Sequence, residues 1–452
     1  MARVVIDPVT RIEGHLRVEV EVDNGVVKDA WVSGGLYRGM ESVLLGRAPS
    51  DAFYVAQRIC GVCPISHGHA STMGSEAAMG IKIPNNARII RNIIEGAEAL
   101  HSHILWFYTL TALDYVDVVS ALSANIADTY ALAEAAGTST ADFGAIQKRL
   151  KGFVEGGQLS IFTNGYWGHP AMKLSPELNL IAVAHYLEAL EMQSEAAAII
   201  AVMGGKFPHF MTSLPGGTVW IPTEQKLDDI YFRWQKVSNW INGAMIPDTI
   251  AIAAQYLPLA GYGKGVGNYL AWGVYDDKSM DPTKRAMPRG MLVGGLTLTQ
   301  PDPAQIKEYI DHSWYESGDG LNPAKGETKA KFDAYSTDAK YSWVKAPRYE
   351  DKPMEVGPLS RMLVAYVAGD PDVKGLVDFT LAALGKAAGA AGPLPVTALQ
   401  SLLGRVGARN LEAAFVAKKM GAWITELIEA VKGGDSKYFV DKTGEGEGAG
   451  LW

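Results

Sequence analysis

The sequence predicts an α+β protein that is mostly helical, with a bundle of long helices, an N-terminal β-hairpin region and small peripheral strands. Three observations predict this class. Apolar and polar residues alternate from Leu16 to Val32, and apolar residues recur at helical spacing over several long stretches. The region from Ala260 to Leu298 is rich in Gly, Val, Tyr and Leu without a helical period. A period of two residues indicates strands, and a period of about 3.6 indicates helices.

Composition narrows the class of protein further. The chain has 452 residues, of which 48% are hydrophobic and 20% charged, which is typical of a soluble globular protein with two or three packed domains. A net charge of -8 argues against a nucleic-acid binder. The apolar stretch from Ile181 to Met203 carries His185 and several glutamates, so we expect no membrane span in this chain. The N-terminus lacks the pattern of a secretory signal.

The first expected element is a β-hairpin. Residues Leu16 to Val22 alternate between apolar and polar, Asn24-Gly25 is a turn signal, and a second β-rich run ends at Val32. This pattern predicts two antiparallel strands with one buried face. Short helices are expected after it, at Ser42 to Leu45 and at Pro49 to Gln57.

Long helices follow. In the first of them, which starts at Asn85, His101 and His103 are two residues apart and face different directions. We therefore expect them to be core or interface histidines and not ligands of one metal. The other helical patterns cover Ala141 to Gly157, Leu178 to Met203, Thr223 to Ile246, Pro303 to Trp314, Pro358 to Val367 and Leu411 to Val431.

Between these helices lie irregular segments. A turn-rich connector is expected at Asn164 to Pro170, short strands between Ala260 and Leu298, and an extended loop from Tyr341 to Gly357. The sequence thus suggests four regions, which are a β-rich region with the metal motif at 1–84, the long-helix bundle at 85–250, a mixed region at 251–357 and a C-terminal helical region at 358–452.

The chemistry concentrates in the segment from Arg58 to His69, which holds both cysteines of the chain in a C-x-x-C motif. A disulfide framework is excluded, and a soft-metal or redox site is indicated. The motif does not lie in a small βαβ unit, which argues against a thioredoxin-like pair. A structural zinc site made of Cys60, Cys63, His67 and His69 remains an equal alternative on spacing alone.

Several further motifs occur in order along the chain. Together they resemble the large subunits of nickel-iron hydrogenases, and the resemblance covers nearly the whole sequence. The matching segments are Arg11-Ile12-Glu13-Gly14-His15, Arg38-Gly39-Met40-Glu41, Arg58-x-Cys60-Gly61-x-Cys63-x-x-x-His67, Gly168-His169-Pro170, Gly204-Gly205-Lys206-x-Pro208-His209, His312-Ser313-Trp314-Tyr315 and Lys345-Ala346-Pro347-Arg348-Tyr349 through to Leu359.

The resemblance implies the large-subunit fold and a site for the heterolytic cleavage or formation of H2. By position in the motifs, Cys60 is expected to be a terminal nickel ligand and Cys63 a ligand that bridges to an iron carrying CO and CN. Glu13 matches the proton-relay glutamate, Glu41 a Mg²⁺ ligand, and His67 the histidine that hydrogen-bonds a bridging sulfur. The implied partner is a small subunit with iron-sulfur clusters. Family members can be exported with that subunit, so a periplasmic or membrane-associated location and a cytoplasmic one both stay open.

The sequence departs from the family pattern in two ways. No cysteine follows Cys63, whereas the family carries a second motif, D-P-C-x-x-C-x-x-H. Two explanations are a truncated sequence and a separate C-terminal fragment that carries C-x-x-C, and we expect the separate fragment. In the long helix, Ser102, Trp106 and Thr109 replace residues common in the family. The alternative function is a non-catalytic or zinc-binding scaffold subunit, related to hydrogenases and to the quinone-site subunit of complex I.

Overall fold

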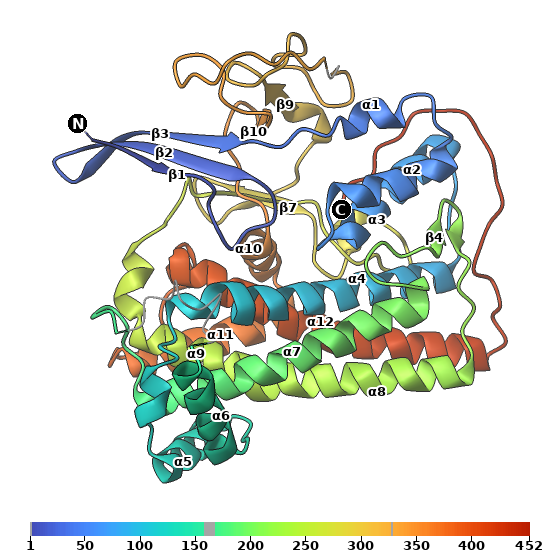
Figure 1. The fold of residues 1–452 in the computed structure, drawn as a ribbon. Helices are drawn as coiled ribbons and strands as arrows, with labels where there is room; N and C mark the ends of the chain where they lie inside the picture. Colours follow the sequence, from blue (N-terminus) through green and yellow to red (C-terminus); the bar gives the residue numbers. More distant parts are fainter. Residues whose placement is uncertain (1, 158–167, 327–328) are drawn as a thin grey trace.

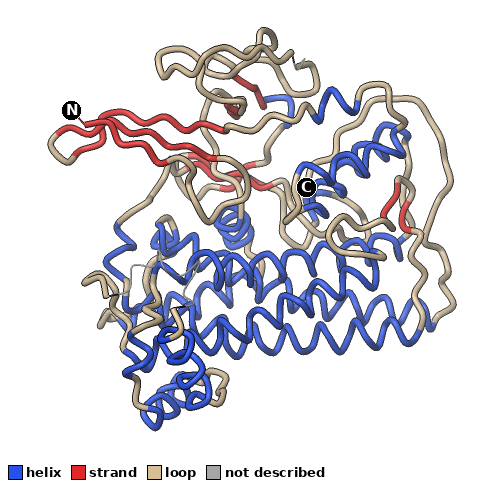
Figure 2. Tube along the Cα trace, in the orientation of Figure 1, coloured by secondary structure: helices blue, strands red, loops and turns tan. Residues whose placement is uncertain are grey.

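The computed structural model describes residues 2–157, 168–326 and 329–452. Long helices lie side by side in one layer, and most of the strands lie above that layer (Figure 1, Figure 2). The predicted α+β class, mostly helical with small sheets, is confirmed. The helices are α1 Met40–Leu44, α2 Pro49–Ala56, α3 Pro64–Met79, α4 Asn85–Leu105, α5 Ile126–Ala136, α6 Phe143–Glu155, α7 Pro176–Gly204, α8 Glu224–Trp240, α9 Ile246–Gln255, α10 Pro358–Ala368, α11 Pro371–Ala387 and α12 Leu402–Lys432.

All strand pairs in the sheets of the described chain are antiparallel. The order β1-β2-β3 forms the N-terminal sheet, β6-β7-β8 a second sheet, and β4-β5 and β9-β10 form two-stranded ribbons. The strands are β1 Ala2–Ile6, β2 Leu16–Asp23, β3 Val26–Gly34, β4 Ser213–Leu214, β5 Gly217–Thr218, β6 Asn268–Ala271, β7 Gly290–Val293, β8 Leu298–Thr299, β9 Ile306–Tyr309 and β10 Ala346–Tyr349.

Helix α4 forms the centre of the core and packs against both α7 and α12. Its isoleucines, among them Ile89 and Ile93, are fully buried. Gly96 explains how closely α4 and α12 approach, because a Cβ there would lie 2.8 Å from Cγ of Met420. The one helix-weakening residue in the predicted long helix therefore has a packing role.

The two histidines of α4 point into different environments, as their spacing predicts. His103 is buried, and its Nε2 lies 3.0 Å from Oε2 of Glu412, which also accepts a hydrogen bond from Arg361 at 2.8 Å. His101 packs edge-to-face on Phe207 with ring centroids 5.0 Å apart. Neither belongs to a candidate metal-binding group among the described residues.

One predicted element is wrong. The segment from Pro303 to Trp314 was expected to be a helix, but only a single 3-10 turn forms at Pro303–Gln305 before the chain enters β9. Residues Ile306–Tyr309 pair with Ala346–Tyr349, so a partner strand distant in sequence overrides the local helical spacing. That partner, β10, also interrupts the expected extended loop from Tyr341 to Gly357.

The other predicted helices and strands form near their expected positions. Several elements have no counterpart in the sequence prediction, among them β1 and the helices α3, α5, α9 and α11. The predicted connector at 164–170 lies outside the described residues up to position 167. The division into four regions stays a prediction.

The N-terminal sheet contains the predicted hairpin, but it buries the polar face. Asn24 and Gly25 form the turn with positive φ angles of 50° and 77°. Glu19, only 3% exposed, accepts hydrogen bonds from Arg17 at 2.9 Å, from Arg3 at 3.1 Å and from the Tyr335 hydroxyl. The loop that carries Tyr335 therefore covers the charged side of the sheet.

Glu19 offers a test of this packing. Burial alone would raise its pKa, but the hydrogen bonds from Tyr335, Arg17 and Arg3 lower it to about 2. Because the pKa of Glu19 is lower in the folded chain than in the unfolded chain, its ionised carboxylate stabilises the fold. This contribution is complete above the ordinary carboxyl pKa and is lost as the pH falls toward 2. We expect Glu19→Gln to cost about 2 kcal/mol at pH 7. The difference in unfolding free energy between this variant and the wild type should become smaller below about pH 4.5.

Urea unfolding followed by circular dichroism at pH 7 and at pH 4 measures this gap. Glu21→Gln, on the same face but only half-buried, is the control and should change stability by less than about 0.5 kcal/mol. A pH-independent gap for Glu19→Gln would contradict the assignment.

The C-terminal tail returns along the outside of α3. A Cβ at Gly446, Gly448 or Gly450 would collide with the backbone of Ala78 or Ala70, so only glycine allows the tail to lie this close. The glycine-rich composition of residues 444–450 is therefore a requirement of packing and not a sign of disorder.

Candidate functional site

The two cysteines lie where a short helical turn meets the start of α3. Cys60 follows the turn Gln57–Ile59, and Cys63 is the residue immediately before the first turn of α3. The backbone N–H of Cys63 donates a hydrogen bond to Sγ of Cys60 at 3.1 Å. The two sulfurs and a ring nitrogen of His67 all lie within 4.8 Å of one another. The structure therefore brings together three of the residues that the sequence singled out.

Two side chains hold the segment in place. The guanidinium of Arg38 donates to the carbonyl of Arg58 at 2.6 Å and to that of Ile59. The amide of Gln57, fully buried, donates to the carbonyl of Phe210 at 3.1 Å. The chain just before Cys60 is thus tied to two distant loops, which orients its sulfur.

Two glutamates from α4 support the start of α3. Glu98 accepts hydrogen bonds from the backbone N–H groups of Ile65 and Ser66 at 3.1 and 3.2 Å, and so satisfies donors that a helix start leaves free. Glu95 accepts from the Ser66 hydroxyl at 2.6 Å. Burial, together with the nearby charge of Glu95, raises the pKa of Glu98 well above its ordinary value.

The surroundings of the cysteine pair disfavour negative charge. Burial raises the pKa of Cys63, and the neighbouring Cys60, Glu98 and Glu13 raise it further. Each of these groups opposes a second negative charge, so a cation is needed to hold both thiols as thiolates. Burial lowers the pKa of His67, which keeps its ring neutral and able to offer a nitrogen lone pair.

Glu13 lies in the exposed loop between β1 and β2 and is close enough to Cys63 to affect its pKa. The loop turns through Arg11 and Gly14, which have positive φ angles of 59° and 104°. The guanidinium of Arg11 donates to the carbonyl of Leu110 at 3.2 Å and pairs with Asp114. This anchors the loop to the helical turns Trp106–Thr111 and Ala112–Asp114, which follow α4.

Two other predicted residues lie apart from the sulfurs. Glu41 is in the first turn of α1 and exposed, and the described residues provide no group of three candidate ligands that contains it. His69 is buried 3.5 Å from Glu95 and stacks on Trp452 with centroids 4.1 Å apart. Cys60, Cys63, His67 and His69 therefore do not form the four-ligand zinc site considered above.

Sequence reasoning missed three neighbours of the site. His209 stands in one of the matching motifs, but the sequence assigned it no role, and the backbone of Cys60 and of Gln57 is close enough to affect its pKa. Burial lowers its pKa, and the charge of Arg58 lowers it further. The other two are Glu95 and Glu98, which are buried on α4 together with other polar residues such as Arg91 and Asn92.

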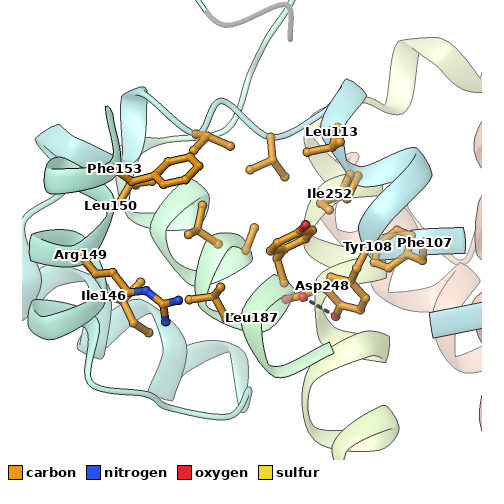
Figure 3. Close-up of a pocket in the computed structure, with 16 residues that line it drawn as sticks. Phe107, Tyr108, Leu113, Ile146, Arg149, Leu150, Phe153, Leu187, Asp248 and Ile252 are labelled. Carbon is orange, nitrogen blue, oxygen red and sulfur yellow. Dashed lines mark hydrogen bonds between the residues drawn. The ribbon is translucent and has the colours of Figure 1, made fainter. Parts of the chain in front are cut away.

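A separate apolar cavity of about 250 Å³ lies between α6, α7 and the end of α4 (Figure 3). Leu113, Leu150, Phe153 and Ile252 line it, and Asp248 in its wall accepts a hydrogen bond from Tyr108 at 2.7 Å. Its lining has no thiol or imidazole, so it offers no set of soft-metal ligands. The site of chemistry is therefore the cysteine pair and not this cavity.

In the described part of the chain, no helix combines the length and the low polarity that a bilayer crossing requires. The sequence model of a family described as nickel-dependent hydrogenase matches residues 38–449, and a second model, described as HoxL-like, matches residues 3–33.

Two curated proteins illustrate the similarity. The uptake hydrogenase large subunit of Rhizobium leguminosarum bv. viciae is 41% identical and is aligned over 97% of this chain and 79% of its own length. The hydrogenase-2 large chain of Escherichia coli (strain K12) is 39% identical over 99% of this chain and 83% of its own length. A solved structure, the reduced Ni-Fe-Se hydrogenase from D. vulgaris Hildenborough, superposes with a TM-score of 0.76 at 34% identity and covers 98% of this chain and 80% of that one.

Proposed function

Because this chain belongs to the nickel-dependent hydrogenase family as a large subunit, we propose that Cys60 and Cys63 are its ligands to the nickel-iron centre. The protein is an oxidoreductase that acts on H2 at such a centre. The observation that carries the ligand proposal is that both sulfurs of the chain and a ring nitrogen of His67, whose pKa is lowered by burial, lie within 4.8 Å of one another. The family match does not favour the alternative of a zinc-binding or non-catalytic scaffold.

The donor set suits this group of metals. Thiolates are soft ligands and bind nickel and iron well. Burial and the neighbouring acidic groups oppose a thiolate at Cys63, and the charge of divalent metal ions would offset this effect. When bound, the centre would supply the heterolytic cleavage of H2 into a proton and a hydride equivalent, and oxidation of the hydride equivalent would then yield the second proton and two electrons. CO and CN as ligands of the iron are part of the proposal.

Two thiolates do not complete a nickel-iron site, so we propose that others come from polypeptide outside this sequence. A separate C-terminal fragment with a C-x-x-C motif would supply them. Cys60 is the proposed terminal nickel ligand, and Cys63 the bridging one.

Glu13 is the proposed proton acceptor. It is the carboxylate near Cys63 that also reaches solvent, whereas Glu95 and Glu98 are buried. A proton that arrives at its carboxylate can therefore pass to water without crossing the core. The anchored loop between β1 and β2 keeps that carboxylate near the sulfur.

Two further roles complete the proposed site. His67 orients a sulfur through a hydrogen bond, in the way that outer groups tune metal sites. Glu41 is proposed as a ligand of Mg²⁺, which needs additional oxygen donors from other segments.

As a hydrogenase large subunit, the chain pairs with a small subunit. The electrons released from H2 need an acceptor near the centre. We propose that iron-sulfur clusters in the small subunit receive them.

The test is metal analysis and spectroscopy of the purified complex. Nickel and iron in near-equal amounts, after cluster iron is subtracted, should accompany infrared bands of CO and CN and turnover of H2. Zinc alone, with no nickel, would overturn the proposed site.

A further inference from the structure

The first turn of α3 is capped by a side chain from another helix. Cys63 is the N-cap residue of α3, and its own side chain makes no capping hydrogen bond. An N-cap side chain normally accepts a hydrogen bond from the backbone N–H of the second or third helical residue. In α3 these two residues are Ile65 and Ser66, and their N–H groups donate instead to Oε1 and Oε2 of Glu98 on α4, at 3.1 and 3.2 Å.

This arrangement differs from that of several other helices in the described chain. Helices α5, α7, α8 and α12 are each capped by the side chain of their own N-cap residue, namely Asn125, Ser175, Thr223 and Ser401. Cysteine is not among the residues preferred at this position. At the start of α3, therefore, the capping position holds a sulfur, and the capping oxygens come from α4.

The sulfur of Cys63 faces a different set of partners. It lies within 4.8 Å of Sγ of Cys60 and of a ring nitrogen of His67. Without another acceptor, the N–H groups of Ile65 and Ser66 would compete for this sulfur, because a helix start leaves its first N–H groups unsatisfied and attracts a thiolate. A sulfur that accepts such hydrogen bonds has less electron density to give to a metal.

Burial and hydrogen bonds hold Glu98 in place for this role. Glu98 is only 3% exposed, and the Ser66 hydroxyl lies 3.1 Å from its Oε2 and 2.6 Å from Oε1 of Glu95. A carboxyl group keeps acceptor capacity on its oxygens whether it is ionised or protonated. The capping of α3 therefore does not depend on the charge of Glu98.

We propose that Glu98 is a positioning residue for Cys63. By capping α3 from α4, Glu98 occupies the N–H groups of Ile65 and Ser66 and leaves the Cys63 sulfur free to face the metals. The inference rests on the proposed function, in which Cys63 is the bridging ligand. Glu98 acts through the start of α3, in the way that outer groups orient the ligands of a metal.

The test compares Glu98→Met with Glu98→Gln in the full chain produced without nickel. Methionine offers no oxygen, whereas glutamine keeps one acceptor, and both remove the charge that opposes a thiolate at Cys63. In Glu98→Met the freed N–H groups should bond the Cys63 thiolate, so its alkylation by iodoacetamide should be about tenfold faster than in Glu98→Gln, because a helix N-terminus lowers the pKa of a thiol by a unit or more. Peptide mass spectrometry distinguishes Cys63 from Cys60. Loss of charge alone would accelerate both variants equally, and equal rates would overturn the inference.

Glu95→Met and Glu95→Gln are the matched controls. They remove the neighbouring carboxylate but neither of the two backbone hydrogen bonds, so their alkylation rates should agree with each other. Circular dichroism checks that each variant folds. A second measurement needs no change at Glu98: hydrogen exchange at the amides of Ile65 and Ser66 should be the same in Cys63→Ala as in the wild type. Faster exchange in Cys63→Ala would show that the sulfur holds these amides, which would also overturn the inference.

The assembled complex tests the consequence for metal binding. Glu98→Met should lower nickel retention more than Glu98→Gln does, within the about 10- to 100-fold that follows loss of an outer partner of a metal ligand. Equal nickel retention in the two variants would remove the positioning role. Absence of nickel from the wild-type complex would instead overturn the proposed function, whereas the alkylation and exchange measurements need no bound metal and test the capping of α3 separately.

Discussion

Cys63→Ser is expected to abolish nickel retention and H2 turnover. Cys63 stands at the start of α3, within 4.8 Å of both Cys60 and His67, and its sulfur is the proposed bridge between the metals. A serine oxygen is a harder ligand than sulfur and loses its proton far less readily. The loss should exceed the about 10- to 100-fold that follows removal of an outer partner of a metal ligand.

The measurement is nickel per complex together with H2 uptake. Ser71→Ala, further along α3, keeps the helix and should retain both. Because Cys63 is half-buried and serine is close in size, the variant should fold, which circular dichroism can check. Retention of nickel in Cys63→Ser would show that Cys63 is not a nickel ligand. If the wild-type complex instead contained zinc and the variant lost it, a structural zinc site would be supported.

Glu13→Gln is expected to leave nickel and iron in place but to block proton exchange. Glutamine keeps the size of the side chain and cannot accept the proton. General acid–base groups contribute about 10²- to 10⁴-fold to rates, so H/D exchange between H2 and water should fall within that range. Because Glu13 is exposed, its replacement should not disturb folding, so a loss of exchange would not be due to misfolding.

Two further variants isolate the role of this carboxylate. Glu13→Asp, which restores a carboxylate one methylene shorter, should recover part of the exchange. Glu21→Gln, on the neighbouring strand, should leave it unchanged. Full exchange in Glu13→Gln would exclude it from the proton path and direct attention to the buried Glu95 and Glu98.

Helix prediction succeeded where packing agrees with local spacing. The apolar period from Asn85 onward predicts α4, and the structure buries that face between α7 and α12. It failed at Ile306–Tyr309, where the same kind of spacing ends in a strand because β10 supplies the missing hydrogen bonds. Pairing between segments about forty residues apart cannot be read from either segment alone.

The hairpin gives a related lesson. Alternation correctly predicts the strands around Asn24-Gly25 but does not say which face is covered. The loop that carries Tyr335 closes over Glu19 and leaves Val32 exposed. Alternation in the sequence shows that a strand has one apolar and one polar face. Which of the two faces is buried depends on the other segments of the chain that pack against the sheet.

By itself, the sequence determined the family of this protein and the class of its reaction. The order and type of its motifs, centred on Cys60 and Cys63, resemble one family closely, and ligand identity is a property of the residues themselves. Only the tertiary structure decided that His67 joins the sulfurs while His69 turns to Glu95 and Trp452. Two residues along a helix separate side chains by more than half a turn, and the partner that each one meets comes from distant parts of the chain.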